Sequence, residues 1–321
     1  MNLDNYKSLF LDYLVKKSID KEPQNLYAPI NYILNLGGKR LRPIMVLMAC
    51  DLLGGDTKKA LDAALAIEMF HNFSLIHDDI MDKAPIRRGE PTVHKKWDLN
   101  TGILSGDAML ILANTFFNSY SGTTYKNLQM LFNQTALEVC EGQQYDMDFE
   151  SVPSVPLESY IKMITYKTAV LVAASLKMGA IIAQADEDNA KNLYNFGLNL
   201  GIAFQLQDDY LDIYATANFG KQQAGDILEN KKTFLFLKTL ELVNIEDKNI
   251  LLNLYKTKGG SNNKVLQVKQ LFDKYNVPKI LQEEIAHYTN KSIESLNKMT
   301  LDTDKNDFLK TFSEDLMHRT I

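Results

Sequence analysis

The chain has little cysteine, no strong excess of charge of one sign and no long uninterrupted apolar run. Its two cysteines, Cys50 and Cys140, lie far apart without CxxC spacing, so neither a disulfide framework nor a zinc site is indicated, and a reducing compartment is expected. The 35 basic and 40 acidic residues give a net charge of -5 and are mixed throughout. This balance argues against a protein that binds nucleic acid by bulk electrostatics.

A membrane segment is also not evident. The N-terminal stretch MNLDNYKSLFLDYLVKKSID is amphipathic and contains acidic residues, and it has no apolar signal-peptide core. The best candidate span, residues 168–185, is interrupted by Ser175, Lys177 and Gly179, and its alanines suit close helix packing. We therefore expect a buried helix there, a protein that does not span a membrane, and a cytoplasmic location.

Strand signals are scarce, and apolar residues recur at spacings of three and four along most of the chain. Patterns of this kind occupy residues 26–36, 43–53, 61–76, 103–120, 127–149, 158–185, 188–215, 232–243, 264–273 and 278–297. No composition shift marks a linker, and no internal repeat or low-complexity tract appears. The sequence therefore predicts a single all-α domain over residues 1–321.

What the sequence does contain is two acidic motifs, HDDIMD and QDDYLD, each at the end of a strongly apolar helical pattern. On a helix Asp78 and Asp82 share one face, and Asp208 and Asp212 do the same. Like charges at this spacing, at a helix C-terminus, destabilise the helix unless cations lie between them. Oxygen ligands with room for water and phosphate suit Mg²⁺, so two such helices facing one another predict a magnesium cluster that binds a diphosphate.

The two acidic motifs also have interpretations other than a diphosphate site. For one motif alone, a solvated helix end is an equally good interpretation, and it is the second copy that favours metal binding. An EF-hand is excluded because no DxDxDG loop is present. An HD-type phosphohydrolase needs further metal-binding histidines, and the spacing required is absent from the five in the chain, His71, His77, His94, His287 and His318.

Basic residues occur where a diphosphate would need them. In GGKRLRP, Lys39, Arg40 and Arg42 follow a Gly-Gly turn that opens a helix, and such an N-terminus is an anion site. Arg87 and Arg88 follow the first acidic motif within ten residues. Any one basic cluster alone would be interpreted as a solvated face, but acids for metal and arginines for phosphate lie side by side in the sequence.

The series GGKRLRP, HNFSLIHDDIMD, RRGEPTVH, GDAML, YKTAVL, FQLQDDYLD, GKQQAGD and NKKT resembles, in this order, the trans-isoprenyl diphosphate synthases of the polyprenyl synthetase family. The resemblance covers most of the chain. It implies a large helical bundle around a deep central cavity, usually in a homodimer. It also implies head-to-tail condensation of isopentenyl diphosphate with an allylic diphosphate (dimethylallyl, geranyl or farnesyl).

The resemblance also implies roles for individual residues. Asp78, Asp82 and Asp208 would bind three Mg²⁺ ions that hold the allylic diphosphate, with Asp79, Asp212 and Asp226 as outer partners of the metals. Further contacts to the allylic substrate would come from Arg87, Lys167, Thr168, Gln205, Lys221 and Lys231. The isopentenyl diphosphate would be held by Lys39, Arg42, His71 and Arg88. The catalytic set would be Asp78, Asp82, Arg87, Lys167, Asp208 and Lys221.

Three further positions bear on this assignment. Ala224 stands where the family has glycine after GKxx, and Asn230 stands where many members have glycine before the lysine, so the loop that carries Lys221 and Lys231 is less securely assigned. Gly142, in GQQYD, is expected to permit close helix packing rather than to act in the chemistry.

Product length is predicted from the helix that bears the first motif. Phe73 lies five residues before Asp78, Ser74 lies four before, and Phe70 lies another turn away. In the family, aromatic residues at both near positions accompany fifteen-carbon products, and a single aromatic five before resembles twenty-carbon synthases. This pattern predicts geranylgeranyl diphosphate, with farnesyl diphosphate as the alternative. Phe73 as an ordinary core residue is the competing interpretation.

Three rival functions remain to be separated. A terpene cyclase normally replaces the second acidic motif and lacks GGKRxRP. A non-catalytic subunit of a heteromeric synthase tends to lose one motif, whereas both are intact here. A membrane-embedded prenyltransferase needs several hydrophobic spans.

Overall fold

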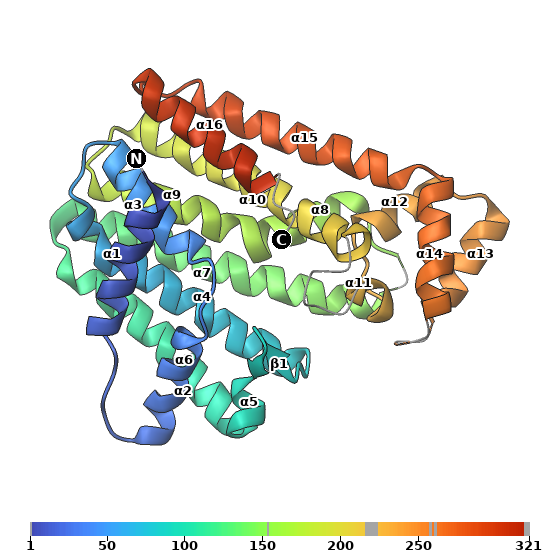
Figure 1. Cartoon of the computed structure of the whole chain (residues 1–321), viewed down its shortest axis with the longest axis horizontal. Coiled ribbons are helices and arrows are strands. Elements are labelled where there is room, and N and C mark those ends of the chain that lie inside the picture. Colours follow the sequence, from blue (N-terminus) through green and yellow to red (C-terminus); the bar gives the residue numbers. More distant parts are fainter. Residues whose placement is uncertain (1, 153, 216–223, 257–258, 260–261, 318–321) are drawn as a thin grey trace. The chain divides into compact units, whose positions relative to one another are not determined.

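The computed structural model of the chain is almost entirely helical, with one two-stranded hairpin (Figure 1). The structure describes residues 2–152, 154–215, 224–256, 259 and 262–317. The helices are α1 (Leu3–Lys16), α2 (Gln24–Asn35), α3 (Leu41–Leu52), η1 (Thr57–Ala60), α4 (Leu61–Met81), α5 (Val93–Lys96), α6 (Leu99–Thr115), η2 (Phe116–Ser119), α7 (Gly122–Ser151), α8 (Leu157–Ile164), η3 (Thr165–Ala169), α9 (Val170–Ile182), α10 (Glu187–Tyr214), α11 (Gly225–Leu228), α12 (Phe234–Leu242), α13 (Ile245–Leu254), α14 (Asn262–Lys274), α15 (Val277–Leu296) and α16 (Thr303–Met317). The hairpin strands are β1 (Ile86–Arg87) and β2 (Glu90–Pro91). The predicted all-α class is confirmed.

Contacts divide the chain into two compact units. Unit 1 comprises Met1–Leu137 and Leu171–Tyr194, and unit 2 comprises Glu138–Val170 and Asn195–Ile321. The first acidic motif belongs to unit 1 and the second to unit 2. The single domain expected from the sequence stays a prediction.

The centre of unit 1 is α4, which is buried over most of its length and packs against α3 and α6. A helix that is apolar on nearly all sides has to lie inside its unit. Its two buried acidic residues are both ion-paired, Glu68 with Arg40 and Asp79 with Arg87. Because α4 is fixed by its neighbours in this way, its C-terminal turn presents the first acidic motif from a rigid support.

Unit 2 has its own apolar core, with Phe234, Phe236, Phe272 and Leu281 fully buried. Helix α8 packs against α12, and α12 packs against α14 and α15. The C-terminal part of α10, which carries the second acidic motif, contributes Leu206 to the same cluster. The second motif is therefore also supported by a packed helix.

The structure adds detail that periodicity did not predict. The pattern over residues 158–185 is broken by η3, a five-residue π-helical turn. Helices α1, α13 and α16 lie outside the ranges predicted as helical, as does the hairpin. One stretch, Leu157–Ile182, is long and apolar enough to cross a membrane, but 67% of the tested window is buried, and core helices meet the same criterion.

Candidate functional site

In unit 1 the first acidic motif occupies the last turn of α4 and the residue after it. Asp78 is half-buried and Asp82 is exposed, whereas only 2% of the surface of Asp79 is exposed. The Arg87 guanidinium clamps Asp79, with Nε 2.8 and 2.9 Å from the two carboxylate oxygens and Nη2 2.7 Å from Oδ1. Arg87 Nη2 also lies 3.7 Å from Asp78 Oδ2. The first phosphate-binding candidate is therefore tied directly to the acidic motif.

The hairpin explains how two adjacent arginines serve different neighbours. Arg87 pairs with Glu90 across the strands, and the turn between them consists of Arg88 and Gly89, with φ of 54° and 82°. A two-residue turn with both φ values positive suits the twist of a hairpin. Arg88 Nη1 then donates to the carbonyl oxygen of Gly37 at 2.5 Å. The hairpin thus links GGKRLRP to the acidic motif.

Gly38 is needed for this link. Its φ is 117°, and a Cβ at this position would lie 2.9 Å from Arg88 Cζ. Any larger residue would therefore be strained and would push the Arg88 guanidinium away. Lys39, the next residue, is exposed at the mouth of the turn.

Arg40, grouped in the sequence with Lys39 and Arg42 as a possible phosphate ligand, has structural partners instead. It adopts a left-handed conformation, with φ of 54°, at the N-cap of α3, and it is buried. Its guanidinium donates to Glu68 and to the carbonyl oxygen of Leu34, and Asn72 Nδ2 donates to Glu68 at 3.1 Å. Arg40 therefore secures the turn that presents Lys39. The signal available in sequence was a lone glutamate inside an otherwise apolar helix.

His71, six residues before the acidic motif, lies beside a cluster of cationic side chains in unit 1. Arg42 Nη1 lies 3.3 Å from His71 Nε2. Burial lowers the pKa of His71 well below its ordinary value, and the nearby guanidinium groups, first those of Arg42 and Arg88, lower it further. His71 is therefore neutral at neutral pH and offers ring nitrogens for hydrogen bonding. All four residues predicted for isopentenyl diphosphate thus belong to unit 1.

The predicted chain-length residues lie on α4 beside an aromatic cluster. The Phe73 ring is 5.5 Å from that of Phe70 and 4.8 Å from that of His77. Phe70 in turn packs on Phe132 with a centroid distance of 5.4 Å. Phe73 retains 7% exposure and Phe70 none, while Ser74 is half-buried and donates to the carbonyl oxygen of His71.

In unit 2 the second acidic motif lies near the end of α10. Asp208 and Asp212 are half-buried, whereas Asp209, between them, retains 4% exposure. Gln205, one turn earlier, donates to Asp209 Oδ1 at 3.1 Å and accepts a hydrogen bond from Thr168 at 3.1 Å. Two predicted contacts of the allylic substrate, Thr168 and Gln205, are thus brought together with the motif.

The π-helical turn η3 holds Lys167 and Thr168. Lys167 Nζ forms a 2.6 Å ion pair with Asp146 Oδ2 on α7. A Cβ on Gly142, one turn before Asp146, would lie 2.2 Å from the Lys167 backbone nitrogen. On the other side, a Cβ on Gly201 would lie 2.7 Å from Ala169 Cα. The expectation that Gly142 permits close helix packing is confirmed, and η3 is held tightly between two helices.

The loop after α10 contains the two departures from the family pattern. Ala224 and Asn230 both have positive φ, of 58° and 60°. Glycine adopts this conformation freely, asparagine tolerates it, and alanine does so at a cost of roughly 1–2 kcal/mol. The family glycines therefore correspond to a backbone requirement that this chain meets with other residues. Lys221 lies outside the described residues.

Asp226 extends the acidic character of unit 2. Its backbone N–H donates to Asp212 Oδ2 at 3.0 Å, and Lys231 Nζ lies 4.0 Å from Asp226 Oδ1. Burial and then the charge of Asp212 raise the pKa of Asp226 to about 7, although Lys231 opposes this rise. Carboxylates are thus crowded here beyond what the neighbouring lysine compensates.

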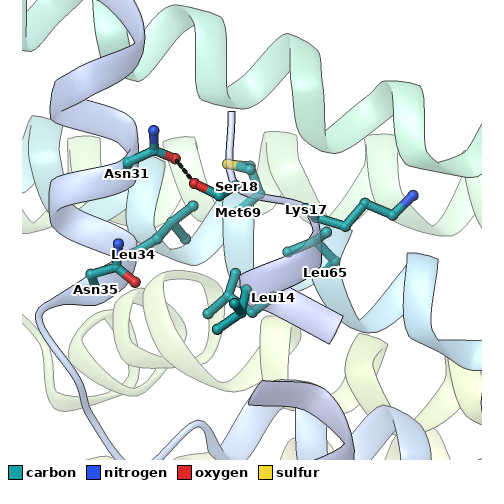
Figure 2. A pocket seen from close by; sticks show the side chains of 9 residues that line it. Leu14, Lys17, Ser18, Asn31, Leu34, Asn35, Leu65 and Met69 are labelled. Atoms are coloured by element: carbon teal, nitrogen blue, oxygen red, sulfur yellow. Dashed lines mark hydrogen bonds between the residues drawn. The ribbon is translucent and has the colours of Figure 1, made fainter. Parts of the chain in front are cut away.

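Across the described parts of the chain, no group of three or more His, Cys, Asp or Glu side chains lies close enough to hold a metal ion. Each acidic motif contributes a pair on one helix face instead. Two hollows in unit 1 contain none of the predicted site residues. Figure 2 shows one of about 110 Å³, where Leu14, Leu34, Leu65 and Met69 line the wall and Ser18 and Asn31 lie within hydrogen-bonding distance. The other, of about 780 Å³, lies among α7, α9 and α10.

Comparisons with known proteins agree with these motifs. The sequence model described as polyprenyl synthetase matches residues 23–274. The chain is 37% identical over 297 residues to the geranylgeranyl diphosphate synthase of Sulfolobus acidocaldarius. This alignment covers 91% of this chain and 89% of the relative. The chain is 39% identical over 236 residues to the geranylfarnesyl diphosphate synthase of Natronomonas pharaonis, covering 68% and 69%. A crystal structure of a geranylgeranyl pyrophosphate synthase superimposes with a TM-score of 0.95 at 45% identity, covering 99% of both chains.

Proposed function

The chain belongs to the polyprenyl synthetase family, and on this premise we propose that it condenses isopentenyl diphosphate with an allylic diphosphate to give geranylgeranyl diphosphate. The resemblance stated from the motifs is confirmed, as is the class of enzyme, a prenyltransferase. The chain length of the product and the roles of individual residues are proposals.

One observation carries the proposal: unit 1 joins an acidic motif to a cluster of cationic side chains through a single hairpin. Arg87 binds the acidic side, and Arg88 reaches the GGKRLRP turn beside Lys39. A terpene cyclase has no second diphosphate to bind and would have no use for this second group of cationic side chains. The arrangement therefore favours an enzyme that takes two diphosphates.

The acidic residues fit Mg²⁺. Asp78 and Asp82 in unit 1, and Asp208 and Asp212 in unit 2, supply hard oxygen donors on one helix face each. Burial, and then the charge of Asp212, raise the pKa of Asp226, and a divalent cation beside these carboxylates would favour the ionised form. A pair rather than a cage of ligands suits Mg²⁺, which keeps several waters and phosphate oxygens. We propose three ions, bound through Asp78, Asp82 and Asp208.

In this mechanism the chain binds, orients and excludes water. Bound Mg²⁺ would neutralise the negative charge that develops on the leaving diphosphate. Arg87 and Lys167 would add fixed positive charge for the same group, as would Lys231 and Lys221. Lys39, Arg42 and Arg88 hold the second diphosphate. The apolar walls exclude water from the allylic cation, and the released pyrophosphate takes the proton.

Neutral His71 has a defined task in this scheme. Because its pKa is low, the imidazole adds no positive charge beside the several guanidinium groups that surround it. The ring nitrogen not shared with Arg42 can donate a hydrogen bond to a diphosphate oxygen. His71 therefore contributes orientation rather than charge.

We also propose a homodimer in which α6 and the first half of α7 face the partner. These helices are joined by Asn114, which accepts from Gln129 at 3.1 Å and donates to Asn133 at 3.2 Å. Large apolar side chains on them are exposed: Leu104 by 59%, Ile111 by 66%, Met130 by 61% and Leu137 by 57%. Such exposure marks an interaction surface. Ile111→Glu should give a monomer by light scattering, and an unchanged mass would contradict this surface.

The test of function is direct. Purified chain is incubated with labelled isopentenyl diphosphate and, in parallel, dimethylallyl, geranyl or farnesyl diphosphate, with Mg²⁺ or with EDTA. We expect a twenty-carbon diphosphate with Mg²⁺ and none with EDTA. A hydrocarbon from an allylic diphosphate alone would establish a cyclase instead. Inactivity of the chain by itself, with activity only beside a second protein, would establish a subunit of a heteromeric enzyme.

A further inference from the structure

A chain of hydrogen bonds in unit 2 links the second acidic motif to the π-helical turn. Thr168, in η3, donates its hydroxyl hydrogen to Gln205 Oε1, and Gln205 Nε2 donates to Asp209 Oδ1, each over 3.1 Å. Tyr160, on α8, donates to the other carboxylate oxygen, Asp209 Oδ2. Segments from α8, η3 and α10 thus meet at one carboxylate.

The two residues at one end of this chain of bonds, Asp209 and Tyr160, are deeply buried. Asp209 keeps 4% of its surface exposed and Tyr160 keeps 2%. The hydrogen-bond partners of Asp209 are a hydroxyl and an amide. A carboxylate in such surroundings is stable only when its oxygens accept hydrogen bonds, so the hydroxyl of Tyr160 is a necessary part of the arrangement.

Asp209 is also turned away from the face that its neighbours share. Successive residues on a helix are about 100° apart, so Asp209 faces α8 while Asp208 and Asp212 share another side. Both of its oxygens already accept hydrogen bonds from the protein. The middle aspartate of the second motif therefore has a task other than that of Asp208.

The task follows from the direction of the bonds. Because the Gln205 amide nitrogen points to Asp209, its carbonyl oxygen has to face Thr168. Thr168 therefore acts as the donor in that bond, and its oxygen keeps lone pairs for a cationic or hydrogen-bond-donating group. Without Asp209 the amide could turn over and reverse the polarity at Thr168.

We propose that Tyr160 and Asp209 are positioning residues, which together fix Gln205, and through it Thr168, in the orientation that the allylic substrate meets. This inference rests on the proposed function, which assigns Thr168 and Gln205 to that substrate. Neither Tyr160 nor Asp209 touches the substrate. They act through the side chain between them.

The test is Tyr160→Phe, which removes one hydroxyl group and keeps the ring. We expect kcat/KM for the allylic diphosphate to fall by about tenfold, as for the loss of one buried hydrogen bond, while KM for isopentenyl diphosphate stays within about twofold. The matched control is Tyr6→Phe, because Tyr6 donates to Asp51 at 2.5 Å between α1 and α3, among no predicted site residues. This control should keep all kinetic constants even where its melting temperature falls.

A double-mutant cycle separates positioning from plain stability. If Tyr160 acts through Gln205, Tyr160→Phe should change kcat/KM by less than about twofold in a Gln205→Ala background. Wild-type kinetic constants in a folded Tyr160→Phe protein, or an equal rise in both KM values, would overturn this inference alone. A folded wild-type chain without prenyl transfer would overturn the proposed function and this inference with it.

Discussion

Asp79 and Asp209 are the second aspartates of the two acidic motifs, and both are buried, but their neighbours differ. Asp79 faces a cation, the guanidinium of Arg87. Asp209 faces the hydroxyl of Tyr160 and the amide of Gln205. Burial raises the pKa of both carboxyls, and Arg87 limits the rise at Asp79, whereas burial and then the charge of Asp226 raise that of Asp209 well above its ordinary value.

A repeated sequence motif is therefore not a repeated structure. In each motif the middle aspartate attaches the helix to its own unit, through the hairpin in unit 1 and through α8 in unit 2. The flanking residues Asp78 and Asp208 are half-buried and lie on a different face of the helix from the middle aspartate. The comparison implies that the flanking positions do the same work in both units and the middle positions do not.

The largest expected effect tests the first half of this comparison. Asp78→Ala and Asp208→Ala should each lower kcat by roughly 1,000-fold. Each removes a carboxylate that is proposed to hold the Mg²⁺ that neutralises the leaving diphosphate. Asp302→Ala, an exposed acid on a turn, is the control and should keep full activity. Steady-state kinetics at saturating Mg²⁺ measures all three. A large loss in only one of the two motif variants would show that the flanking positions are not equivalent.

The second half of the comparison concerns stability. Asp79→Asn leaves Arg87 without its carboxylate, and we expect a loss of about 2 kcal/mol, below the usual cost of breaking a fully buried pair because Arg87 is partly exposed. Asp209→Asn replaces a carboxyl that has neutral partners, and we expect a loss below about 1 kcal/mol. Urea unfolding of the metal-free proteins measures both. An equal loss, or a larger one at Asp209, would remove the distinction between the two surroundings.

The next test uses pH, because the described residues of unit 2 include no arginine to compensate the carboxylates, as Arg87 does in unit 1. Asp226 has its pKa raised to about 7 by burial and by Asp212, so the folded state binds this proton more tightly than the unfolded state. The stability from that proton is complete below about pH 4 and is lost as the pH rises through 7. The melting temperature of the EDTA-treated chain should therefore fall by about 5 °C between pH 5 and 8.

Asp226→Asn serves as the matched variant for this fall. It cannot titrate, so its melting temperature should change less over the same pH range. Mg²⁺ requires the ionised carboxylates and should stabilise the wild type more at pH 8 than at pH 6. Identical pH profiles for the wild type and Asp226→Asn would rule out Asp226 as the group responsible.

The sequence predicted the helices because apolar periodicity is a local property: α10 ends within one residue of its pattern, and α4 continues five residues past Ile76, through the acidic motif. It could not predict η3, since the residues of that turn carry no local signal that separates a π-helical turn from an α-helix. Its cause is non-local: the missing side chains of Gly142 and Gly201 let two helices approach the Lys167 backbone and Ala169. Gly142 was noticed in the sequence, but the partner it approaches was not visible there.

The same limit applied to the site. Helix spacing alone places Asp78 and Asp79 on different faces. It cannot show that Arg87 pairs with Asp79, or that Tyr160, about fifty residues from Asp209, donates a hydrogen bond to it. Arg40 was quoted among possible phosphate ligands, and its partner Glu68 lies 28 residues away. The basic residues could thus be recognised in the sequence by their type. Only their contacts show which of them have a structural role and which stay candidates for binding substrate.

The smallest expected effect concerns product length, and it uses a difference between the two motif helices. Five residues before the first aspartate, α4 has Phe73 and α10 has Ala203. Phe73→Ala makes the two helices alike at this position and opens space beside Phe70. We expect products longer by one five-carbon unit on chromatography. Phe117→Leu changes the same aromatic cluster from η2 and should keep the twenty-carbon product. If both variants keep the twenty-carbon product, Phe73 is an ordinary core residue and does not limit the length of the product, because its side chain would have been removed without effect.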